Sequence, residues 1–458
     1  MSSTSKKWIA VAVAALAIAA IAGGAAGLLA GESEQRGAAN PDRAASARPG
    51  LPTGYEARNT VSAPAAAPAA GWIGEAQLAT EDTWEPSIAA DPGQPYVYAM
   101  YNRYGPSCGR SCPNPAMFLR ISADGGATWA AERLICTCKT QGQYDPVLAT
   151  TSAGAVYGTW MNYNQIVFSK SPRGGASWTT PIVISGRSWA DKPWIGTSAD
   201  GVDVYIGYES RSVLYLTASH DSGATWSIPV AVNSDSSVYR YPNGFAVLPN
   251  GTAVLAASKY PGGSKQATGS VDIDIWRTVD GGTSWSRVVV DTVFTGVDYN
   301  TSSTTTIAGD AGGTLVLEYS GAVTSGTNGR LFVRRSTDGG VTWSVRTELG
   351  DASANASFPA ITSRGTGDFR LTWMDNRGGG WNVYYRASSD GGLTWPAASL
   401  DISEATTGPS YKSAAGFGSP YGDYDAIAIT SFGKAISVSG QGASFSGGPG
   451  GIWVNRQS

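Results

Sequence analysis

Acidic and aromatic side chains recur next to each other along this chain, a combination that suits a sugar ligand. Aromatic rings stack on the apolar faces of sugars, and carboxylates accept hydrogen bonds from their hydroxyl groups. Two facing carboxylates can also cleave a glycosidic bond, with a separation of about 5 Å in a retaining enzyme and about 6.5–9.5 Å in an inverting one. The positions are Trp84 with Glu85, Tyr144 with Asp145, Trp189 with Asp191, and Tyr424 with Asp425; Tyr241 instead follows a basic residue, Arg240.

These residues carry our predictions for the site. The same acids could instead cap strands or bond neighbouring backbone amides, and Asp375 with Arg377 could form a salt bridge within one structural unit. We expect no cofactor, although close carboxylates could share a proton or hold Ca²⁺. The predicted catalytic carboxylates are drawn from Glu85, Asp145, Asp191 and Asp425, and the predicted substrate-binding residues are Trp84, Tyr144, Trp189, Arg240, Tyr241, Asp375, Arg377 and Tyr424.

A repeated eight-residue phrase indicates which elements position these residues. The Asp-Gly-Gly in most copies predicts a tight turn at a hairpin tip, because Asp accepts bonds from nearby amides and Gly adopts positive φ readily. The closing Trp is expected to pack back into its unit, so that truncating it to Ala would cost roughly 3–5 kcal/mol. The copies are Ser122–Trp129, Ser171–Trp178, Ser219–Trp226, Thr278–Trp285, Ser336–Trp343 and Ser388–Trp395.

Five copies keep the acid, which we expect to be structural: Asp124, Asp221, Asp280, Asp338 and Asp390. The second copy has Arg173 at that position and lacks the acceptor. We therefore expect its turn to be the loosest of the six.

The spacing of the phrase predicts the fold. Its copies start 48 to 59 residues apart, and alternating apolar segments precede and flank each copy, as in 96–100 and 156–160. Four antiparallel strands per unit of about 50 residues is the blade of a β-propeller. After the last copy, 424–429, 434–438 and 451–454 supply three more strands, and 72–78 could supply the fourth. We predict an all-β, seven-bladed propeller closed by pairing the N- and C-terminal strands, with six blades as the alternative.

The phrase resembles the Asp-box (BNR) repeat of the sialidase-like β-propeller superfamily, over residues 72–458. The resemblance implies a retaining glycosidase with a Tyr nucleophile, a Glu that activates it, an Asp acid/base and three arginines that clamp a carboxylate. Where the family has Arg-Ile-Pro at the start of its first blade, this chain has Glu85-Pro86. A rebuilt clamp would use other arginines, namely Arg103, Arg187, Arg211, Arg240 and Arg377.

The propeller resemblance also places the site. The innermost strand of each blade lines the central channel, and its N-terminal end lies on the face opposite the Asp-box turns. The acidic and aromatic residues described above would therefore share one face. The single histidine, His220, lies inside an Asp-box phrase on the other face, which argues against histidine-dependent catalysis.

The N-terminus predicts export. Lys6 and Lys7 precede an uncharged run rich in Ala, Val, Ile and Leu, so 1–31 is predicted to be a cleaved signal peptide or an N-terminal membrane anchor. Residues 32–71 are rich in Ala and Pro and are predicted to be a disordered linker. For an exported chain two disulfides are the default use of Cys108, Cys112, Cys136 and Cys138.

Composition narrows the function classes. The 458 residues include 59 Gly and 16 Trp, only 15% are charged, and the net charge is −3, so no nucleic-acid partner is implied. Two hypotheses follow for what we expect to be a secreted or cell-surface monomer that meets the membrane only through its N-terminal segment. The first is a sialidase-like glycoside hydrolase acting on extracellular glycans. The alternative is a non-catalytic propeller that binds glycan or protein.

Overall fold

The computed structural model describes residues 68–79, 82–105, 112–136, 141–186, 189–263, 268–296, 304–403, 409, 411–445, 448 and 450–458. The predicted signal peptide or anchor and the predicted linker up to residue 67 lie outside these ranges. All described residues belong to one of the two compact units of the chain, Asp42–Ser458. Among them, no helix combines the length and the apolar character needed to span a bilayer.

The described part of the chain is all-β, as predicted, and most of its sheets are antiparallel with four strands. The first three sheets follow the chain order. They contain β2 (Thr83–Ala90), β3 (Val97–Arg103), β4 (Ala116–Ser122) and β5 (Arg133–Leu134); β6 (Gln143–Thr150), β7 (Val156–Asn162), β8 (Gln165–Ser171) and β9 (Ile182–Val183); and β10 (Asp191–Thr197), β11 (Val204–Ser210), β12 (Val213–Ser219) and β13 (Val230–Ala231).

The next sheet has eight strands, in two groups joined by a single pair of residues, Phe294 and Ala322. A four-stranded sheet follows it. A short 3-10 turn, η2 (Pro261–Gly263), follows strand β15 (Ala253–Tyr260). The strands are β14 (Tyr239–Val247), β15 (Ala253–Tyr260), β16 (Ser270–Thr278) and β17 (Ser286–Phe294); β18 (Thr305–Gly309), β19 (Leu315–Ala322), β20 (Gly329–Ser336) and β21 (Thr347–Glu348); and β22 (Ala356–Arg364), β23 (Asp368–Asp375), β24 (Asn382–Ser388) and β25 (Leu400–Asp401).

The last sheet joins the two ends of the described chain. Strands β28 (Ser419–Ile429), β29 (Ala435–Gly442) and β30 (Gly450–Gln457) are completed by β1 (Trp72–Ala79), which pairs antiparallel with β30. Trp72 lies opposite Gln457, and Gln77 lies opposite Trp453. The predicted pairing of the N- and C-terminal strands is therefore present, and a small two-stranded sheet of β26 (Lys412–Ser413) and β27 (Gly416–Phe417) precedes it.

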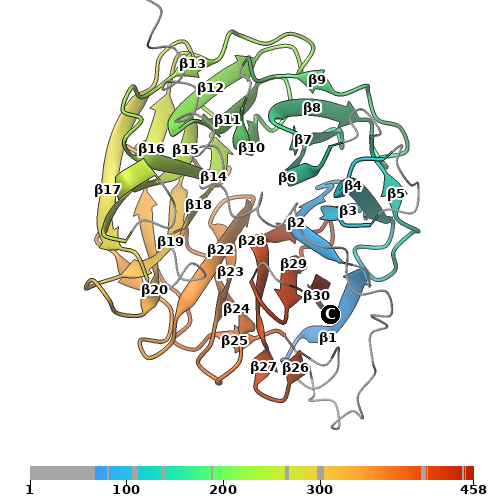
Figure 1. Ribbon diagram of the computed structural model, residues 1–458, viewed down its shortest axis with the longest axis vertical. Coiled ribbons are helices and arrows are strands. Elements are labelled where there is room, and N and C mark those ends of the chain that lie inside the picture. Colours follow the sequence, from blue (N-terminus) through green and yellow to red (C-terminus); the bar gives the residue numbers. More distant parts are fainter. Residues whose placement is uncertain are drawn as a thin grey trace, which may run out of the picture. The chain divides into compact units, whose positions relative to one another are not determined.

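The first strands of the sheets surround a common centre (Figure 1). Going along the chain, β2, β6, β10, β14, β18, β22 and β28 each contact the next one, and β28 contacts β2. Hydrophobic clusters fill the spaces between neighbouring sheets; one of them contains Tyr157 and Phe168 of the second sheet with Ile195 and Ile206 of the third. Each sheet thus buries both of its faces against its neighbours.

Most of these inner strands contain the same backbone irregularity near their start. Glu85, Asp145, Lys192 and Phe358 have φ values of 50–54° and each precedes a proline. A positive φ in a residue other than Gly costs of order 1–3 kcal/mol and persists only where the surroundings enforce it. The strand register shifts at each of these positions, which is the mark of a β-bulge. A bulge re-aims a side chain, and here it affects three charged residues.

The Asp-box turns have the structure that their sequence predicts. In the fifth copy, Asp338 accepts bonds from the Thr342 amide at 2.9 Å and from the Ser336 hydroxyl at 2.8 Å. Hydrogen bonds from the Ser284 hydroxyl and amide lower the pKa of the corresponding Asp280 to about 2. The closing Trp of each turn is partly buried against a hydrophobic cluster, as Trp343 is. The phrase is thus a folding device.

Arg173 changes how the second turn is held. Its Nε donates at 2.6 Å to Oδ2 of the buried Asp91, which directly follows strand β2 of the preceding sheet. The amide of Gly174 donates to the Tyr98 hydroxyl at 2.9 Å. The turn therefore loses its internal acceptor and is fastened to the neighbouring sheet instead; that it is the loosest turn stays a prediction.

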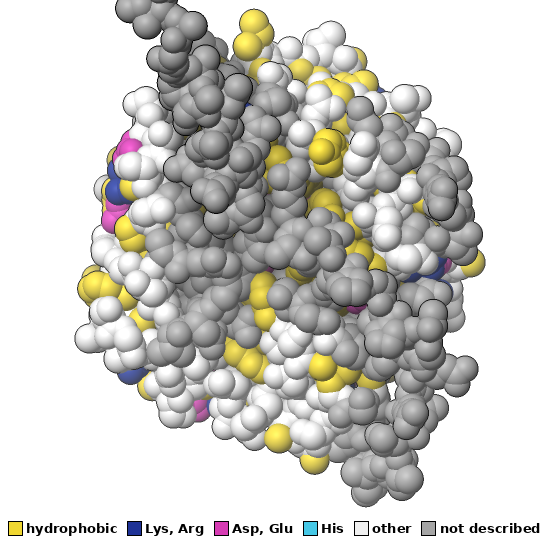
Figure 2. Space-filling model, viewed as in Figure 1, with side chains coloured by type: hydrophobic (Ala, Val, Ile, Leu, Met, Phe, Trp, Pro, Cys, Tyr) yellow, Lys and Arg dark blue, Asp and Glu magenta, His cyan; other side chains and the backbone are white. Residues whose placement is uncertain are grey.

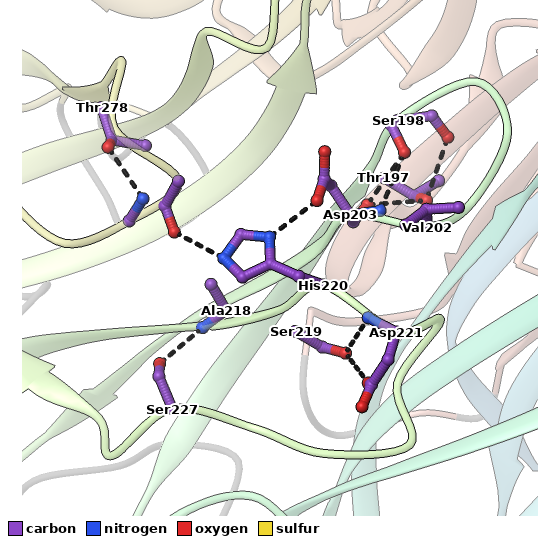
Figure 3. A network of polar contacts seen from close by, with 12 residues as sticks. Thr197, Ser198, Val202, Asp203, Ala218, Ser219, His220, Asp221, Ser227 and Thr278 are labelled. Atoms are coloured by element: carbon purple, nitrogen blue, oxygen red, sulfur yellow. Dashed lines mark hydrogen bonds and ion pairs between the residues drawn. The ribbon is translucent and has the colours of Figure 1, made fainter.

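Cationic side chains link each of several sheets to the Asp-box turn of the next. The donor usually precedes the first residue of a phrase, but in the third copy that position is Ala218 and His220 takes over the contact. Nδ1 of His220 lies 2.7 Å from Asp203, and its Nε2 donates to the Gly281 carbonyl at 3.0 Å (Figure 3). The other contacts are Lys170 to the Ser222 carbonyl, Arg277 to Gly339 and Arg335 to Gly391, at 2.7–2.9 Å.

These cross-sheet contacts should contribute to stability. We expect Arg335→Met to lower the free energy of unfolding by about 1.5–3 kcal/mol, because it removes a charged donor from the turn carbonyl of Gly391. The matched control is Arg330→Met in the same strand, which removes only an exposed pair with Glu348 and should cost under about 1 kcal/mol. Urea unfolding of both variants measures the difference, and equal costs would contradict the interpretation.

Candidate functional site

Four charged side chains meet at the centre of the ring of inner strands. The Lys192 ammonium bonds Asp145 Oδ1 at 2.8 Å and Asp423 Oδ2 at 2.6 Å. Oxygens of Glu85, Asp145 and Asp423 lie within 4.8 Å of one another. All four side chains are at most 2% exposed. They come from β2, β6, β10 and β28, so the cluster ties the last sheet to the first three.

Polar partners complete this cluster. Glu85 Oε2 accepts from the Asp145 amide at 2.9 Å and from Asn102 Nδ2 at 2.7 Å. The Tyr424 hydroxyl donates to Asp145 Oδ1 at 2.9 Å, and the Lys192 ammonium lies 5.3 Å from the centre of the Tyr424 ring. A buried charge is tolerated only when it is paired and hydrogen-bonded in this way.

The three acids are spaced as the ligands of a metal ion would be. However, the Lys192 ammonium already bonds two of them and stands where a cation would neutralise them. We therefore interpret the cluster as an internal ion-pair network.

A second acidic group lies beside this cluster, on the pair β10 and β11. Asp191 and Glu209 are opposite each other in the ladder, so their side chains lie on the same face of the sheet. Burial raises the pKa of Glu209 to about 7, although a bond from the Ser212 amide and the Lys192 charge lower it. Asp191 Oδ1 accepts from the Lys192 amide at 2.9 Å. The arrangement pairs a carboxyl group that is substantially protonated at neutral pH with a second acid next to a buried cation.

Tyr239, at the start of β14, faces this acidic pair. Burial raises the pKa of its hydroxyl well above the usual value, and the charges of Glu209 and Asp191 raise it further. Strand β14 contacts both β10 and β11. The centre of the Tyr239 ring lies 6.3 Å from that of Tyr260 and 6.5 Å from that of Tyr241. Aromatic surface therefore adjoins the two carboxyl groups.

A central cavity of about 300 Å³ runs along the inner strands. Its wall includes Pro86, Pro146 and Trp194 at one end, and Thr197 and Ser363 at the other. Most of the lining belongs to small or apolar residues of the seven inner strands. Tyr424 and Asp425 also line it, so the ionic cluster adjoins one end of the cavity.

Asp425 lies apart from the other predicted catalytic acids. Its carboxyl group is near Glu318 of β19, and burial raises the pKa of both groups well above their usual values. Both oxygens of Glu318 are buried, and neither has a hydrogen-bond partner within the described ranges. This pair forms a separate site in the interior, where burial favours the neutral form of both carboxyl groups.

Several predicted substrate-binding residues are occupied in packing or ion pairs. Trp84 stacks on Tyr421 at 5.4 Å. Arg377 Nε bonds Asp375 Oδ1 at 2.9 Å, and its guanidinium lies 3.8 Å from the centre of the Tyr384 ring. This is the salt bridge given above as the alternative role.

The remaining predicted residues differ in exposure. Tyr144, Tyr241, Tyr424 and Arg240 are buried, whereas Trp189 is half-buried. Arg103 is paired with Glu132, Arg211 is exposed, and Arg187 lies outside the described residues. On the face in Figure 2, charged side chains of the described residues lie mostly toward the rim, with hydrophobic ones between.

The predicted disulfides fall partly on residues that the structure does not describe. Cys112 and Cys136 are buried. No described cysteine is free. Cys108 and Cys138 lie outside the described residues, so the pairing stays a prediction.

Sequence reasoning named Asp191 and missed Glu209 as its partner. The signal was the hairpin of β10 and β11, whose turn at Asp200 and Gly201 brings Asp191 opposite Glu209. Tyr239 was missed because the prediction of substrate-binding residues at this strand start named its neighbours Arg240 and Tyr241 instead. Lys192 and Asp423 each adjoin a predicted residue, Asp191 and Tyr424, but their contact spans the ring and has no local signature.

Comparisons with known proteins agree with the repeat. The BNR repeat-like domain family matches residues 94–252. The fold is similar to a polysaccharide lyase family PL25 ulvan lyase bound to a GlcA–Rha3S unit, with TM-score 0.51 and 13% identity over 84% of this chain and 95% of that one. No curated protein matches the chain.

Two further solved structures show weaker similarity. One is a Hadza microbial sialidase, with TM-score 0.43 and 16% identity over 82% of this chain and 66% of that one. The other is the Penicillium chrysogenum α-L-arabinanase complexed with arabinobiose, with TM-score 0.47 and 14% identity over 84% of this chain and 98% of that one. The chain thus spans about two thirds of the sialidase and nearly all of the other two.

The buried Glu318 should make stability depend on pH. Its pKa is raised in the folded state, so its contribution is fully present below the unfolded pKa and is lost as pH rises through the folded pKa. The Gln side chain of Glu318→Gln carries no charge at any pH. As the pH rises from 5 to 8, we therefore expect the Tm of this variant to fall less than the Tm of the unmodified protein.

The control for this prediction has the opposite sign. Hydrogen bonds from the Thr394 hydroxyl and amide lower the pKa of Asp390 to about 2. The stability that Asp390 contributes is therefore present above its unfolded pKa and lost as pH falls toward 2. Asp390→Asn should lower Tm at neutral pH and flatten its fall in acid. Identical pH profiles for the two variants would refute both assignments.

Proposed function

We propose that this protein is an exported glycoside hydrolase acting on extracellular glycans, a proposal that the match of residues 94–252 to the BNR repeat-like domain family supports. One observation carries the proposal: Glu209, with its pKa raised to about 7, lies directly opposite Asp191. A glycosidase uses one carboxyl group with a raised pKa as the acid and a second carboxylate as the nucleophile, and we assign these roles to Glu209 and Asp191. Export is supported by the Lys6-Lys7 and apolar segment at the N-terminus.

The ladder supports a retaining mechanism. Residues directly opposite in an antiparallel pair have Cβ atoms about 4.5–5.5 Å apart, so the carboxyl groups of Asp191 and Glu209 can reach the separation of about 5–5.5 Å that a retaining enzyme needs. Protonated Glu209 would donate its proton to the leaving oxygen while ionised Asp191 attacks the anomeric carbon. Glu209, now ionised, would then take a proton from the water that releases the sugar from Asp191. Tyr239 would offer its ring to the sugar.

The proposal includes the architecture around the pair. Two observations support seven blades: the contacts that run from β2 through β28 and back to β2, and the completion of the last sheet by β1. Sialidase-like propellers have six blades, and the sialidase arginine clamp has no counterpart in the contacts of Arg103 and Arg377. We therefore expect a substrate other than a sialoside. We also propose that the protein acts as a monomer.

A second candidate, a non-catalytic propeller that binds glycan, is favoured by one observation. Asp191 and Glu209 are only 2% and 3% exposed. Acids so deeply buried fit a role in shaping a binding surface. The two candidates differ in whether the carboxyl pair is needed for turnover or only for affinity.

The catalytic roles can be tested on the secreted protein with a panel of fluorogenic and natural glycosides. We expect Glu209→Gln to lower kcat on natural substrates by about 10²–10⁴-fold, because general acid catalysis is lost, and far less on fluorogenic substrates with good leaving groups. Asp191→Asn should abolish activity on both.

The matched control is Glu348→Gln, which removes an exposed acid paired with Arg330 and should leave activity unchanged. Hydrolysis that survives both Glu209→Gln and Asp191→Asn would refute the assignment. Glycan binding without hydrolysis by any form of the protein would favour the second candidate.

The proposed acid and nucleophile, Glu209 and Asp191, act without a metal ion. We expect EDTA, and Ca²⁺ added back after it, to change neither Tm nor turnover, as measured by thermal unfolding and by the glycoside assay. A rise in Tm of several degrees with Ca²⁺ would show that a cation binds to the folded protein.

A further inference from the structure

We propose that Lys192 is a positioning residue of the site, whose ammonium group sets the charge balance behind Asp191 and Glu209. The inference rests on the proposed function, because it assigns Lys192 a part in the same reaction. Lys192 itself does not touch the substrate in this proposal.

The geometry fixes the ammonium group firmly. Lys192 has a φ of 50° and precedes a proline in the bulge of β10. Its Nζ is held by Asp145 from β6 and by Asp423 from β28, across the ring of inner strands. At 2% exposure, water screens its charge poorly, so its field acts strongly on nearby groups.

The ionisable groups around Lys192 come from every neighbouring strand. Asp145 and Asp423 bond it directly, and Glu85 lies behind Asp145. Its Nζ lies 5.8 Å from the centre of the Tyr241 ring. The remaining groups are Tyr424 from β28, Tyr239 from β14, Asp191 from β10 and Glu209 from β11.

The direction of the effect follows from the signs of these charges. Burial raises the pKa of Glu209, and the Lys192 charge partly reverses that rise. Lys192 also opposes the rise in the pKa of Tyr239. The ammonium therefore keeps the proton of Glu209 transferable near neutral pH, while Asp145 and Asp423 limit how strongly it does so.

Two substitutions separate this electrostatic role from a structural one. Lys192→Met removes the positive charge, so we expect the basic limb of the kcat/KM pH profile to move up by about one pH unit, in the range for a lost opposite charge. Asp423→Asn removes a negative partner of Lys192 and should move the same limb down. Both break a buried ion pair and should lower Tm, so loss of structure alone cannot produce opposite shifts.

The double variant Lys192→Met/Asp423→Asn removes one charge of each sign. We expect its basic limb to return close to that of the unmodified protein. If Lys192→Met does not fold, the comparison rests on Asp423→Asn and the double variant. The proposal would be overturned if the basic limb of the kcat/KM pH profile moved in the same direction in Lys192→Met and Asp423→Asn. It would also be overturned if the limb did not move in variants that fold.

A readout independent of turnover separates this inference from the proposed function. Carboxyl ¹³C NMR titration can follow Glu209, with its signal identified by its loss in Glu209→Gln. We expect the Glu209 pKa to rise in Lys192→Met and fall in Asp423→Asn even if no glycoside is hydrolysed. If the Glu209 pKa shifts in opposite directions in the two variants but no glycoside is hydrolysed, the electrostatic role of Lys192 stands and the proposed hydrolase activity is refuted. If glycosides are hydrolysed but the Glu209 pKa does not change, the hydrolase activity stands and the role of Lys192 is refuted.

Discussion

The bond of one buried ammonium group to two carboxylates is the interaction on which the centre of this protein depends. Lys192 lies on β10, Asp145 on β6 and Asp423 on β28, so a single charge connects strands that are far apart in the chain. Breaking a buried pair by removing one partner typically costs about 3–5 kcal/mol, because an uncompensated charge stays buried. The ring must therefore close accurately for the cluster to form, and the cluster in turn holds the inner strands at fixed distances.

The bulges that place these charges have an energetic cost for the backbone. Glu85, Asp145 and Lys192 each adopt a positive φ before a proline, at the same position of three successive inner strands. That conformation is unfavourable for residues with a side chain. It persists because the hydrogen bonds of the ionic cluster and the packing of neighbouring sheets over-determine it. Phe358 has the same conformation without a charge, which shows that the bulge belongs to the repeat and that the charges were placed on it.

Much of the architecture could be predicted because its signals are local. The Asp-box phrase marks hairpin tips by the chemistry of Asp and Gly, and alternation marks the strands, so the four-stranded sheets and the pairing of β1 with β30 followed. Glu85 and Asp145 were found because they occupy one position of the repeat. Glu209 and Tyr239 were not, because their roles depend on the register between strands and on burial. Asp425 was grouped with the other acids, yet its carboxyl group lies near Glu318, while Asp423 two residues earlier joins Lys192.

The two ends of each sheet serve different purposes for a physical reason. At the Asp-box end, the acids are solvated and their hydrogen bonds keep them ionised, so a lost contact can be replaced, as His220 replaces a cation and Arg173 an acid. At the opposite end, the charges are buried and each depends on its partners, so no member can be exchanged alone. In a chain with only 15% charged residues, four buried charges thus meet at one place. Chemistry is expected there, because buried groups with interdependent protonation are the ones that a protein can tune for proton transfer.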